Sequence, residues 1–518
     1  MVERRLHWAG AVAALLLAGC DNLCETPGCL FTRAEWERVS SLSNLPEQPP
    51  QDTSNKYQAN AAARALGQKF YFDARFSGNV TMVDTLRRPV PYARSNISCA
   101  TCHNPTRAGT DATSNPGHVS VGAGWYDVNS QPTVNAAYYE SIYWNGRNDS
   151  LWAQIVAVNE SFVSMNSTRL NDFWWIMDKY SAEYGAVFGA DWPLPTGTGT
   201  TLAEVQAATN NFANNKCTLD GSGGCTNPAC RVASDGSCWP RFPRNGKPGS
   251  KSGCQSTDAT EPFSDAYDCM DAADKTTVTR VYVNFAKAIA AYESTLISRD
   301  SNFDKWVAAG PGSNLLSDAA KRGARLFVGK AACYECHNTP LFSDDDFHNV
   351  GVPQVGAAVP TEADCVAGAV CDCVAGSNCL PWGAWDGFKK LSANGFKRTS
   401  AFSDAPTDTS FQRWYDRAAL VAANDPSAEG MKGQWRTPGL RDVSLTGPYM
   451  HDGLYRTLED VIWHYDGGGA PSGYTGTKAV QLKPLGLTDQ DVSDLVAFLG
   501  TLNGAPLPTS LVTSPVLP

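Results

Sequence analysis

Two copies of the pattern Cys-x-x-Cys-His constrain this chain more than any other feature of its sequence. They read Cys99-Ala-Thr-Cys-His103 and Cys333-Tyr-Glu-Cys-His337. Two cysteines three positions apart on a helical turn reach both vinyl groups of one haem, and the adjacent histidine reaches its iron. A thioredoxin-like dithiol or half of a zinc site is the alternative, but neither requires histidine after the second cysteine in both copies. We therefore expect two covalent haem c groups held by Cys99, Cys102, Cys333 and Cys336, with His103 and His337 as proximal iron ligands.

The composition is that of an acidic globular protein. The 518 residues include 42 Lys plus Arg against 52 Asp plus Glu, so the formal net charge is −10. That charge argues against nucleic acid as a partner. Apolar residues make up 42% of the chain and charged residues 18%, enough to bury substantial cores. Strand signals are sparse, and we expect a mainly α fold.

The chain divides into two similar halves, each with a helix that leads into its Cys-x-x-Cys-His motif. An apolar stripe predicts the first helix over 61–72, and Ser317 caps the second, which ends near Gly329. Each half closes with a further helix, over 277–298 and 488–502, the latter opened by a capping box of Thr488 and Asp491. We expect two cytochrome-c-like haem domains, 58–305 and 306–518, with loop insertions at about 193–274 and about 352–430.

The first residues resemble the signal of a bacterial lipoprotein. Arg4 and Arg5 precede an apolar run that ends in Leu17-Ala-Gly-Cys20. The run is shorter than the roughly 20 residues a membrane-spanning helix needs, so residues 1–19 are expected to be removed. Cys20 then carries the lipid, and 20–57 forms a tether. This predicts a periplasmic or cell-surface protein anchored to the bacterial outer membrane, with a plain secretory signal as the alternative.

The remaining cysteines fit an oxidising compartment. Of the 17 cysteines, Cys20 and the four motif cysteines are set aside, which leaves an even number and allows six disulfides. Zinc sites compete with this interpretation, but no histidine accompanies the middle cluster. We expect pairing within three clusters: Cys24 and Cys29; Cys217, Cys225, Cys230, Cys238, Cys254 and Cys269; and Cys365, Cys371, Cys373 and Cys379.

The sixth iron ligands are not fixed by the motifs. Of seven histidines, His7 leaves with the signal and two are proximal, so four imidazoles remain: His118, His348, His451 and His464. Methionine and tyrosine are also candidates.

Several further stretches carry a resemblance to a known family. Leu66-Gly-Gln-Lys-Phe70, Gln131-Pro-Thr-Val-Asn-Ala-Ala-Tyr138, Tyr143-Trp-Asn-Gly-Arg147, Arg436-Thr-Pro-Gly-Leu-Arg441 and Gly447-Pro-Tyr-Met-His-Asp-Gly453 occur in this order around the two motifs. Together they resemble the bacterial di-haem cytochrome c peroxidase and MauG family over most of the mature chain. The resemblance implies an N-terminal haem that reacts with peroxide and a C-terminal haem that relays electrons.

The resemblance also implies roles for residues around the second haem. Tyr465 stands fourteen residues after His451, where peroxidases of the family have a methionine ligand and MauG-type members a tyrosine. Tyr465 is thus the leading sixth ligand, with Met450 as the competing one. A phenolate favours the oxidised states of iron and lowers its potential relative to a thioether. Trp144 corresponds to the family tryptophan that relays electrons between the haems.

Between the haems, similar proteins hold a calcium ion. Asn129, Thr446 and Pro448 occupy the matching positions, and their oxygen atoms suit this hard cation. Ordinary loop hydrogen bonding is the alternative role for these residues.

On the distal side of the first haem the sequence departs from the family pattern. Gln154 matches the family amide, but Ser164 stands where a glutamate usually precedes Met165-Asn166. Glu160 is the candidate that replaces this glutamate in the cavity. The alternative is that Glu160 is an exposed residue on a helix. The loop that supplies a switchable histidine in resting peroxidases reads Gly122-Ala-Gly-Trp125, which implies five-coordinate iron unless His118 reaches it. His348 and His451 match loop positions that make hydrogen bonds near the second haem.

The motifs and the family resemblance are compatible with three functions. The leading one is a cytochrome c peroxidase that reduces hydrogen peroxide with electrons from a donor protein, such as a small cytochrome or cupredoxin, through the C-terminal haem. The second is a MauG-like oxidase acting on a protein or small-molecule substrate. The third is a non-catalytic electron-transfer cytochrome.

Overall fold

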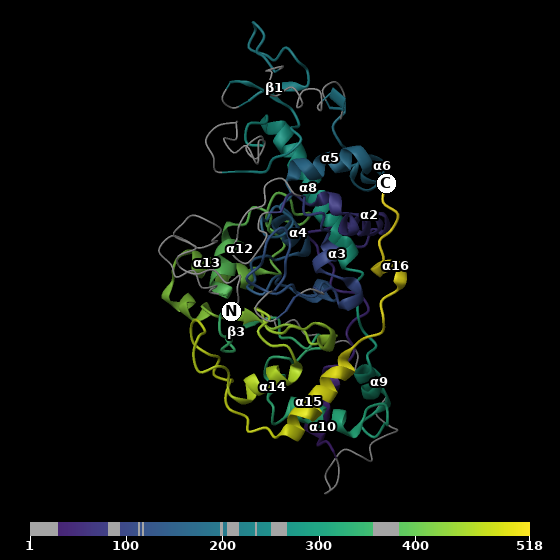
Figure 1. Cartoon of the computed structure of the whole chain (residues 1–518), viewed down its shortest axis with the longest axis vertical. Coiled ribbons are helices and arrows are strands. Elements are labelled where there is room, and N and C mark those ends of the chain that lie inside the picture. Colours follow the sequence, from purple (N-terminus) through teal and green to yellow (C-terminus); the bar gives the residue numbers. More distant parts are fainter. Residues whose placement is uncertain are drawn as a thin grey trace.

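A computed structural model of the chain shows a mainly α-helical protein, as expected (Figure 1). The structure describes residues 30–518 except 81–93, 112–113, 116–118, 197–199, 202, 205–216, 234–235, 250–266 and 356–382. Cys20, His118 and the cysteines at 24, 29, 254 and 365–379 lie outside the described residues. Within the described ranges, no helix has both the length and the apolar character needed to span a bilayer.

Two crossed helices form the core of the N-terminal half. α2 (Ala61–Phe72) has the bounds predicted from its apolar stripe and is capped by Asn60, whose side chain accepts from the backbone N–H of Ala63. It packs against α8 (Ala272–Glu293), and a Cβ at Gly67 would lie 1.9 Å from the carbonyl oxygen of Ala288. Glycine lets the two backbones touch at this crossing. Around this pair pack α3 (Cys99–Cys102), α4 (Leu151–Asn159), α5 (Arg169–Lys179) and α6 (Ser181–Phe188).

The helix α8 lies several residues upstream of the expected 277–298. Asp271 caps it by accepting from the backbone N–H groups of Ala273 and Asp274. The residues that follow Asp271, Ala-Ala-Asp-Lys-Thr-Thr, have no large apolar side chain at helical spacing, which is why periodicity alone placed the start too late.

The C-terminal half repeats the same construction (Figure 1). Ser317 caps α10 (Asp318–Val328), and the Thr488–Asp491 capping box opens α15 (Asp489–Leu499), both as predicted. Here too a glycine marks the crossing, because a Cβ at Gly323 would lie 2.0 Å from the carbonyl oxygen of Asp494. The same core includes α1 (Arg33–Ser41), α9 (Asn302–Ala309) and α14 (Leu458–Asp466).

The two ends of the described chain cross between the halves. α1 packs on α10 of the C-terminal half. In the opposite direction, the segment after α15 runs back along the N-terminal half through α16 (Thr509–Val512) and ends near α6 (Figure 1). Tyr292 donates a hydrogen bond to the carbonyl oxygen of Leu511 at 2.6 Å, and Arg75 donates to that of Pro518 at 3.0 Å. The N-terminal end of the described chain therefore packs on the C-terminal half, and the C-terminal end packs on the N-terminal half.

The segment expected as a loop insertion at 352–430 contains two packed helices. α12 (Ala384–Ala393) and α13 (Gln412–Ala422) share a separate apolar core with Phe347. Phe347 belongs to β3 (Phe347–His348), which pairs antiparallel with β4 (Trp435–Arg436). The regular apolar spacing of Trp385, Phe388 and Leu391 was hidden by the neighbouring stretch rich in Gly, Ala and Cys.

The cysteine-rich segment of the N-terminal half forms a small disulfide-bonded hairpin. β1 (Cys230–Val232) pairs with β2 (Cys238–Pro240), and disulfides join Cys217 to Cys230 and Cys225 to Cys238. Cys269 is disulfide-bonded as well. The structure thus confirms disulfides in the middle cluster. The four motif cysteines Cys99, Cys102, Cys333 and Cys336 stay free, as haem attachment requires.

Candidate haem sites

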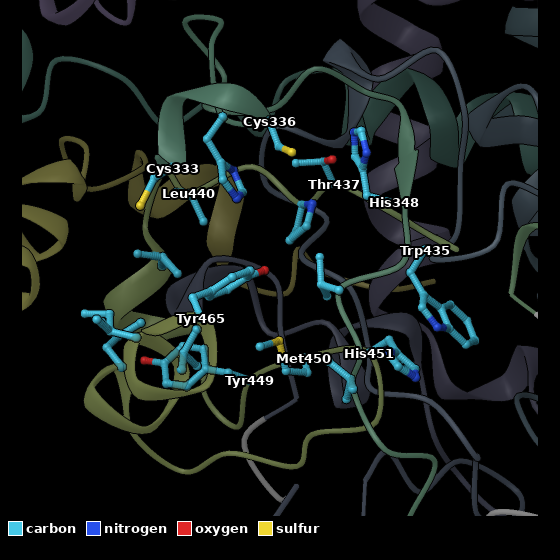
Figure 2. Close-up of a pocket in the computed structure, with 18 of the residues that line it drawn as sticks. Cys333, Cys336, His348, Trp435, Thr437, Leu440, Tyr449, Met450, His451 and Tyr465 are labelled. Carbon is cyan, nitrogen blue, oxygen red and sulfur yellow. The ribbon is translucent and has the colours of Figure 1, made fainter. Parts of the chain in front are cut away.

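Each Cys-x-x-Cys-His motif opens into its own cavity. The first lies at α3, where Cys99, Cys102 and His103 line a cavity of about 1120 Å³, including space open to solvent. Cys333 and Cys336 line the second (Figure 2), together with His337; its volume is about 1680 Å³, including space open to solvent. Both cavities are walled mainly by apolar side chains, as expected for a large flat macrocycle.

Backbone carbonyl groups orient the two proximal histidines. Nδ1 of His103 lies 3.1 Å from the carbonyl oxygen of Gly109 and 3.0 Å from that of Gln131. Nδ1 of His337 lies 2.6 Å from the carbonyl oxygen of Phe342. Donation from Nδ1–H fixes the tautomer and leaves Nε2 for a metal. Burial lowers the pKa of both histidines, which favours the neutral, ligating imidazole. The residues therefore fit two covalently attached haems.

Tyr465 enters the second cavity from α14 (Figure 2). Burial raises the pKa of its phenol, so ionisation inside this cavity needs a nearby positive charge, such as an iron. Met450 lines the same cavity from the loop before α14. The structure thus brings both candidate sixth ligands to one site.

The described histidines outside the motifs have other partners. Both ring nitrogens of His464 are occupied, Nδ1 by Tyr455 Oη at 2.8 Å and Nε2 by the carbonyl oxygen of Val350 at 2.8 Å. His451 lines the second cavity, but its Nε2 lies 3.1 Å from Gln354 Oε1 and its ring stacks on Trp435 at 3.8 Å. His451 is therefore held by a hydrogen bond and by ring stacking in the wall of the second cavity.

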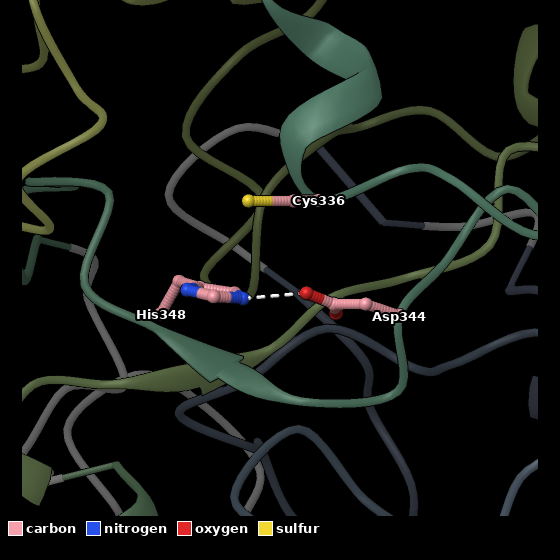
Figure 3. Close-up of side chains that lie close together, drawn as sticks. All are labelled: Cys336, Asp344 and His348. Atoms are coloured by element: carbon pink, nitrogen blue, oxygen red, sulfur yellow. Dashed lines mark hydrogen bonds and ion pairs between the residues drawn. The ribbon is translucent and has the colours of Figure 1, made fainter. Parts of the chain in front are cut away.

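His348 forms a tight group with Asp344 and Cys336 (Figure 3). Its Nε2 donates to Asp344 Oδ2 at 2.7 Å. The hydrogen bond to Asp344, followed by the one to Cys336, raises the pKa of His348 to about 10. The trio has the ligand atoms of a metal site, but the sulfur of Cys336 is committed to a thioether when haem is attached. His348 is thus a neighbour of the second haem site that is held by its hydrogen bond to Asp344.

Trp144 stands in the wall shared by the two cavities. It lines both of them, as do Asn129 and Arg436. Its indole Nε1–H donates to the carbonyl oxygen of Asn129 at 2.8 Å, and its own carbonyl oxygen accepts from the backbone N–H of Arg436 at 2.8 Å. An oxidisable ring is therefore fixed between the two haem sites.

The residues expected to bind calcium lie next to Trp144. Asn129 Nδ2 donates to the carbonyl oxygen of Pro448 at 2.6 Å, and the Asn129 backbone N–H donates to that of His451 at 2.7 Å. Thr446 and Pro448 line the second cavity together with Asn129. The loop of the C-terminal half thus meets the N-terminal half at Asn129.

Of the two distal candidates, Gln154 lies in the first cavity and Glu160 does not. Gln154 enters it from α4, and its Nε2 donates to Tyr143 Oη at 3.4 Å. Glu160 instead holds Arg169, which donates to its carboxylate from Nε at 2.9 Å and from Nη2 at 2.8 Å. Its side chain is 16% exposed, so it is neither a cavity residue nor the exposed helical residue of the alternative. Arg169, whose guanidinium is buried beneath Tyr282, binds the carboxylate away from the haem site.

Three cavity residues escaped the sequence analysis. Tyr126, Tyr143 and Glu293 all line the first cavity, and Tyr126 Oη shares a hydrogen bond with Ser164 Oγ. Tyr143 belongs to a stretch already singled out for its neighbour Trp144. Glu293 ends α8, where burial raises the pKa of its carboxyl to about 8. No sequence signal marks Tyr126 or Glu293.

Comparisons with known proteins agree with this geometry. The family described as di-haem cytochrome c peroxidase matches residues 61–222. Cytochrome-c peroxidase IdrP1 of Denitromonas iodatirespirans is 27% identical over 448 residues, covering 85% of this chain and 81% of that protein. The methylamine utilization protein MauG of Methylorubrum extorquens is 25% identical over 481 residues, covering 91% of this chain and 86% of that protein.

The chain belongs to the di-haem cytochrome c peroxidase and MauG family. The fold agrees: the crystal structure of the diheme peroxidase BthA from Burkholderia thailandensis aligns with a TM-score of 0.50 at 19% identity, covering 92% of this chain and all of that one. This structural match confirms the mainly α fold, and the family and sequence matches above confirm the expected family. The chain is a peroxidase-like di-haem oxidoreductase, and the family implies two haem c groups, which the two cavities accommodate.

Proposed function

We propose that this protein reduces hydrogen peroxide to water in the His103 cavity, with electrons that enter through the His337 site. When bound, the haems supply one-electron redox chemistry at both sites. The observation that carries the proposal is the position of Trp144, which lines both cavities and is held by Asn129. A rigid aromatic ring between two redox sites shortens each electron-transfer step. The donor is a small redox protein, such as a cytochrome or cupredoxin.

The chain supplies different surroundings at the two sites. At the second site, Tyr465 and Met450 reach into the cavity as candidate sixth ligands. At the first, the described loop 119–126 has no histidine, and the side chains of Gln154, Ser164 and Tyr126 line the cavity instead. An open position for peroxide is therefore proposed at the His103 site and a closed one at the His337 site, with Tyr465 as the ligand.

A second candidate function is oxidation of a protein or small organic substrate, as in MauG-type members. Tyr465 favours it, because a phenolate ligand stabilises oxidised iron. Ser164 favours it too, since the carboxylate usual in the peroxidases is absent from that position.

Rapid mixing with peroxide distinguishes these functions. The spectra of both haems are followed in wild type and in Tyr465→Phe, with and without a reduced small cytochrome. Fast multiple turnover with the cytochrome supports the peroxidase. Oxidising equivalents that persist in the spectra while the cytochrome stays reduced support the oxidase. Two low-spin signals in the electron paramagnetic resonance spectrum of the resting protein contradict both and leave an electron carrier.

We further propose a calcium ion between the two halves, bound by the Asn129 side chain and the carbonyl groups of Thr446 and Pro448. The 2.6 Å contact between Asn129 and Pro448 supports it, because a modest turn of the amide directs Oδ1 to the same point. Treatment with a chelator should slow electron transfer between the haems, and calcium, but not magnesium, should restore it. Metal analysis that finds no calcium in active protein contradicts this site.

The location of the protein is also a proposal. We infer export to the periplasm, with Cys20 as the lipidated residue of an outer-membrane anchor. Mass spectrometry of the mature N-terminus tests it directly: a diacylglyceryl-modified Cys20 is expected, and Cys20→Ser should release the protein from the membrane fraction. An unmodified N-terminus downstream of Cys20 contradicts the anchor.

A further inference from the structure

The first cavity is lined by the hydrogen-bonded pair Gln154 and Tyr143 and by a second polar pair. Tyr126 Oη and Ser164 Oγ are hydrogen-bonded to each other, and both residues line the cavity. Ser161 Oγ lies 3.5 Å from the same phenol oxygen. Ser164 takes the place of the glutamate usual in the family, so the phenol meets the cavity where the carboxylate is missing.

Backbone contacts fix Tyr126 in this position. The loop 119–126 lies against the turn 161–165, with the backbone N–H of Gly124 donating to the carbonyl oxygen of Val163 at 3.0 Å. Tyr126 itself donates from its backbone N–H to Ser120 at 3.0 Å. A Cβ at Gly122 would lie 2.6 Å from the carbonyl oxygen of Ser164, so only glycine permits this close approach. These backbone hydrogen bonds and the close approach at Gly122 thus hold the loop that carries the Tyr126 phenol.

Among the described residues that line the first cavity, the only carboxyl is that of Glu293. Burial raises the pKa of Cys99 and of Tyr71, and Glu293 lies close enough to both that its carboxylate, when ionised, raises these pKa values further. Tyr71 Oη in turn donates to the carbonyl oxygen of His103 at 2.5 Å. Glu293 therefore belongs to the side of the cavity that carries the histidine, whereas Tyr126 shares its wall with Ser164.

We propose that Tyr126, through its hydrogen bond to Ser164, is the proton-transfer residue for peroxide cleavage in this protein. The inference rests on the proposed peroxide reaction and names the group that performs it. As the O–O bond breaks, its electron pair stays with the outer oxygen, which takes the phenol proton and leaves as water. Ser164 passes its proton to the phenol oxygen and accepts the proton lost by the inner oxygen. The remaining oxygen leaves as the second water after two electrons from the donor and two protons from solvent arrive.

The test compares Tyr126→Phe with wild type in two measurements on the holoprotein. The first is the second-order rate constant for peroxide, with its solvent isotope effect. Loss of proton transfer should lower this constant by about 100-fold. The second is the affinity of the ferric protein for fluoride, an anion that is stabilised by a hydrogen-bond donor above the iron. Removing one such donor should weaken fluoride binding by about 10-fold.

Matched variants identify the cause of any loss. Tyr138→Phe removes a phenol that donates to Pro46 away from the cavity, and both constants should stay at the wild-type value. Ser164→Ala keeps the phenol but breaks the relay, so the peroxide reaction should slow with little change in fluoride affinity. Ser164→Glu in the Tyr126→Phe background restores the family carboxylate and should recover the peroxide rate.

The outcomes separate the inference from the proposed function. If wild type does not react with peroxide, the proposed function fails, and equal fluoride affinities in wild type and Tyr126→Phe then overturn the inference as well. If wild type reacts and Tyr126→Phe matches it in both measurements, only the inference is overturned. A loss of the peroxide reaction in Glu293→Gln, with Tyr126→Phe unaffected, overturns it in favour of the carboxyl.

Discussion

The indole N–H of Trp144 donates to the carbonyl oxygen of Asn129 at 2.8 Å, and both residues line the two haem cavities. The same asparagine reaches across to the C-terminal half through Pro448 at 2.6 Å. One residue thus orients the ring between the haem sites and joins the two halves of the protein there. The Pro448 loop therefore contacts the same residue that holds the Trp144 indole.

Replacing Trp144 by phenylalanine should slow electron transfer between the haems. Phenylalanine keeps an aromatic ring but is much harder to oxidise, and it lacks the N–H that binds Asn129. We expect the rate to fall by at least tenfold when peroxide is mixed with protein whose C-terminal haem is reduced. Trp463→Phe is the matched control, because Trp463 lies on α14 with 41% of its surface exposed. An unchanged rate in Trp144→Phe would exclude the ring as a relay.

Replacing Tyr465 by methionine should raise the reduction potential of the C-terminal haem. A thioether stabilises reduced iron more than a phenolate does, and axial ligands set haem potentials over roughly 0.8 V. We expect an upward shift on the order of 100 mV in a spectroscopic redox titration, well within that span. Tyr449→Phe removes another phenol that lines the same cavity and should leave the potential unchanged. Equal potentials in wild type and Tyr465→Met would favour Met450 as the native ligand.

Local patterns predicted the elements that carry the haems. Ser317 and the Thr488–Asp491 pair are cap residues with a direct backbone partner, so their helices could be placed from sequence. The two motifs brought cysteines and histidine together within five residues. Gln154 was proposed from the family resemblance and not from a local pattern; it lies one helical turn from the cap Ser150 and lines the first cavity together with Leu151, Ile155 and Val158.

The polar environment of the first cavity could not be predicted in this way. Tyr126 meets Ser164 only because two loops 38 residues apart lie against each other. Glu160 is drawn away by Arg169, a pairing between residues nine positions apart that no helical period relates. Side chains on loops are positioned by tertiary contacts, which leave no regular spacing in the sequence.

The two glycines at the helix crossings should be equally intolerant of a side chain. In Gly323→Ala, the new Cβ would lie 2.0 Å from the carbonyl oxygen of Asp494, and in Gly67→Ala 1.9 Å from that of Ala288. Because backbone must move in both cases, we expect each variant to lose about 1–3 kcal/mol of unfolding free energy. Denaturant unfolding of the holoprotein measures it. Gly185→Ala in α6 is the control: nothing lies within 4 Å of the added Cβ, and stability should stay equal or rise.

The buried carboxyl of Glu293 should make stability depend on pH. Burial raises its pKa from 4.5 to about 8, so between these values the folded protein holds a proton that the unfolded chain has released. Unfolding free energy is then highest below pH 4.5 and falls as pH rises to about 8, by about 4 kcal/mol at most. Glu293→Gln cannot ionise, so its stability relative to wild type should increase across this range. Denaturant unfolding of both proteins at pH 5 and pH 8 gives the comparison, and a difference that stays constant between the two pH values would show that Glu293 is ionised in the folded protein throughout.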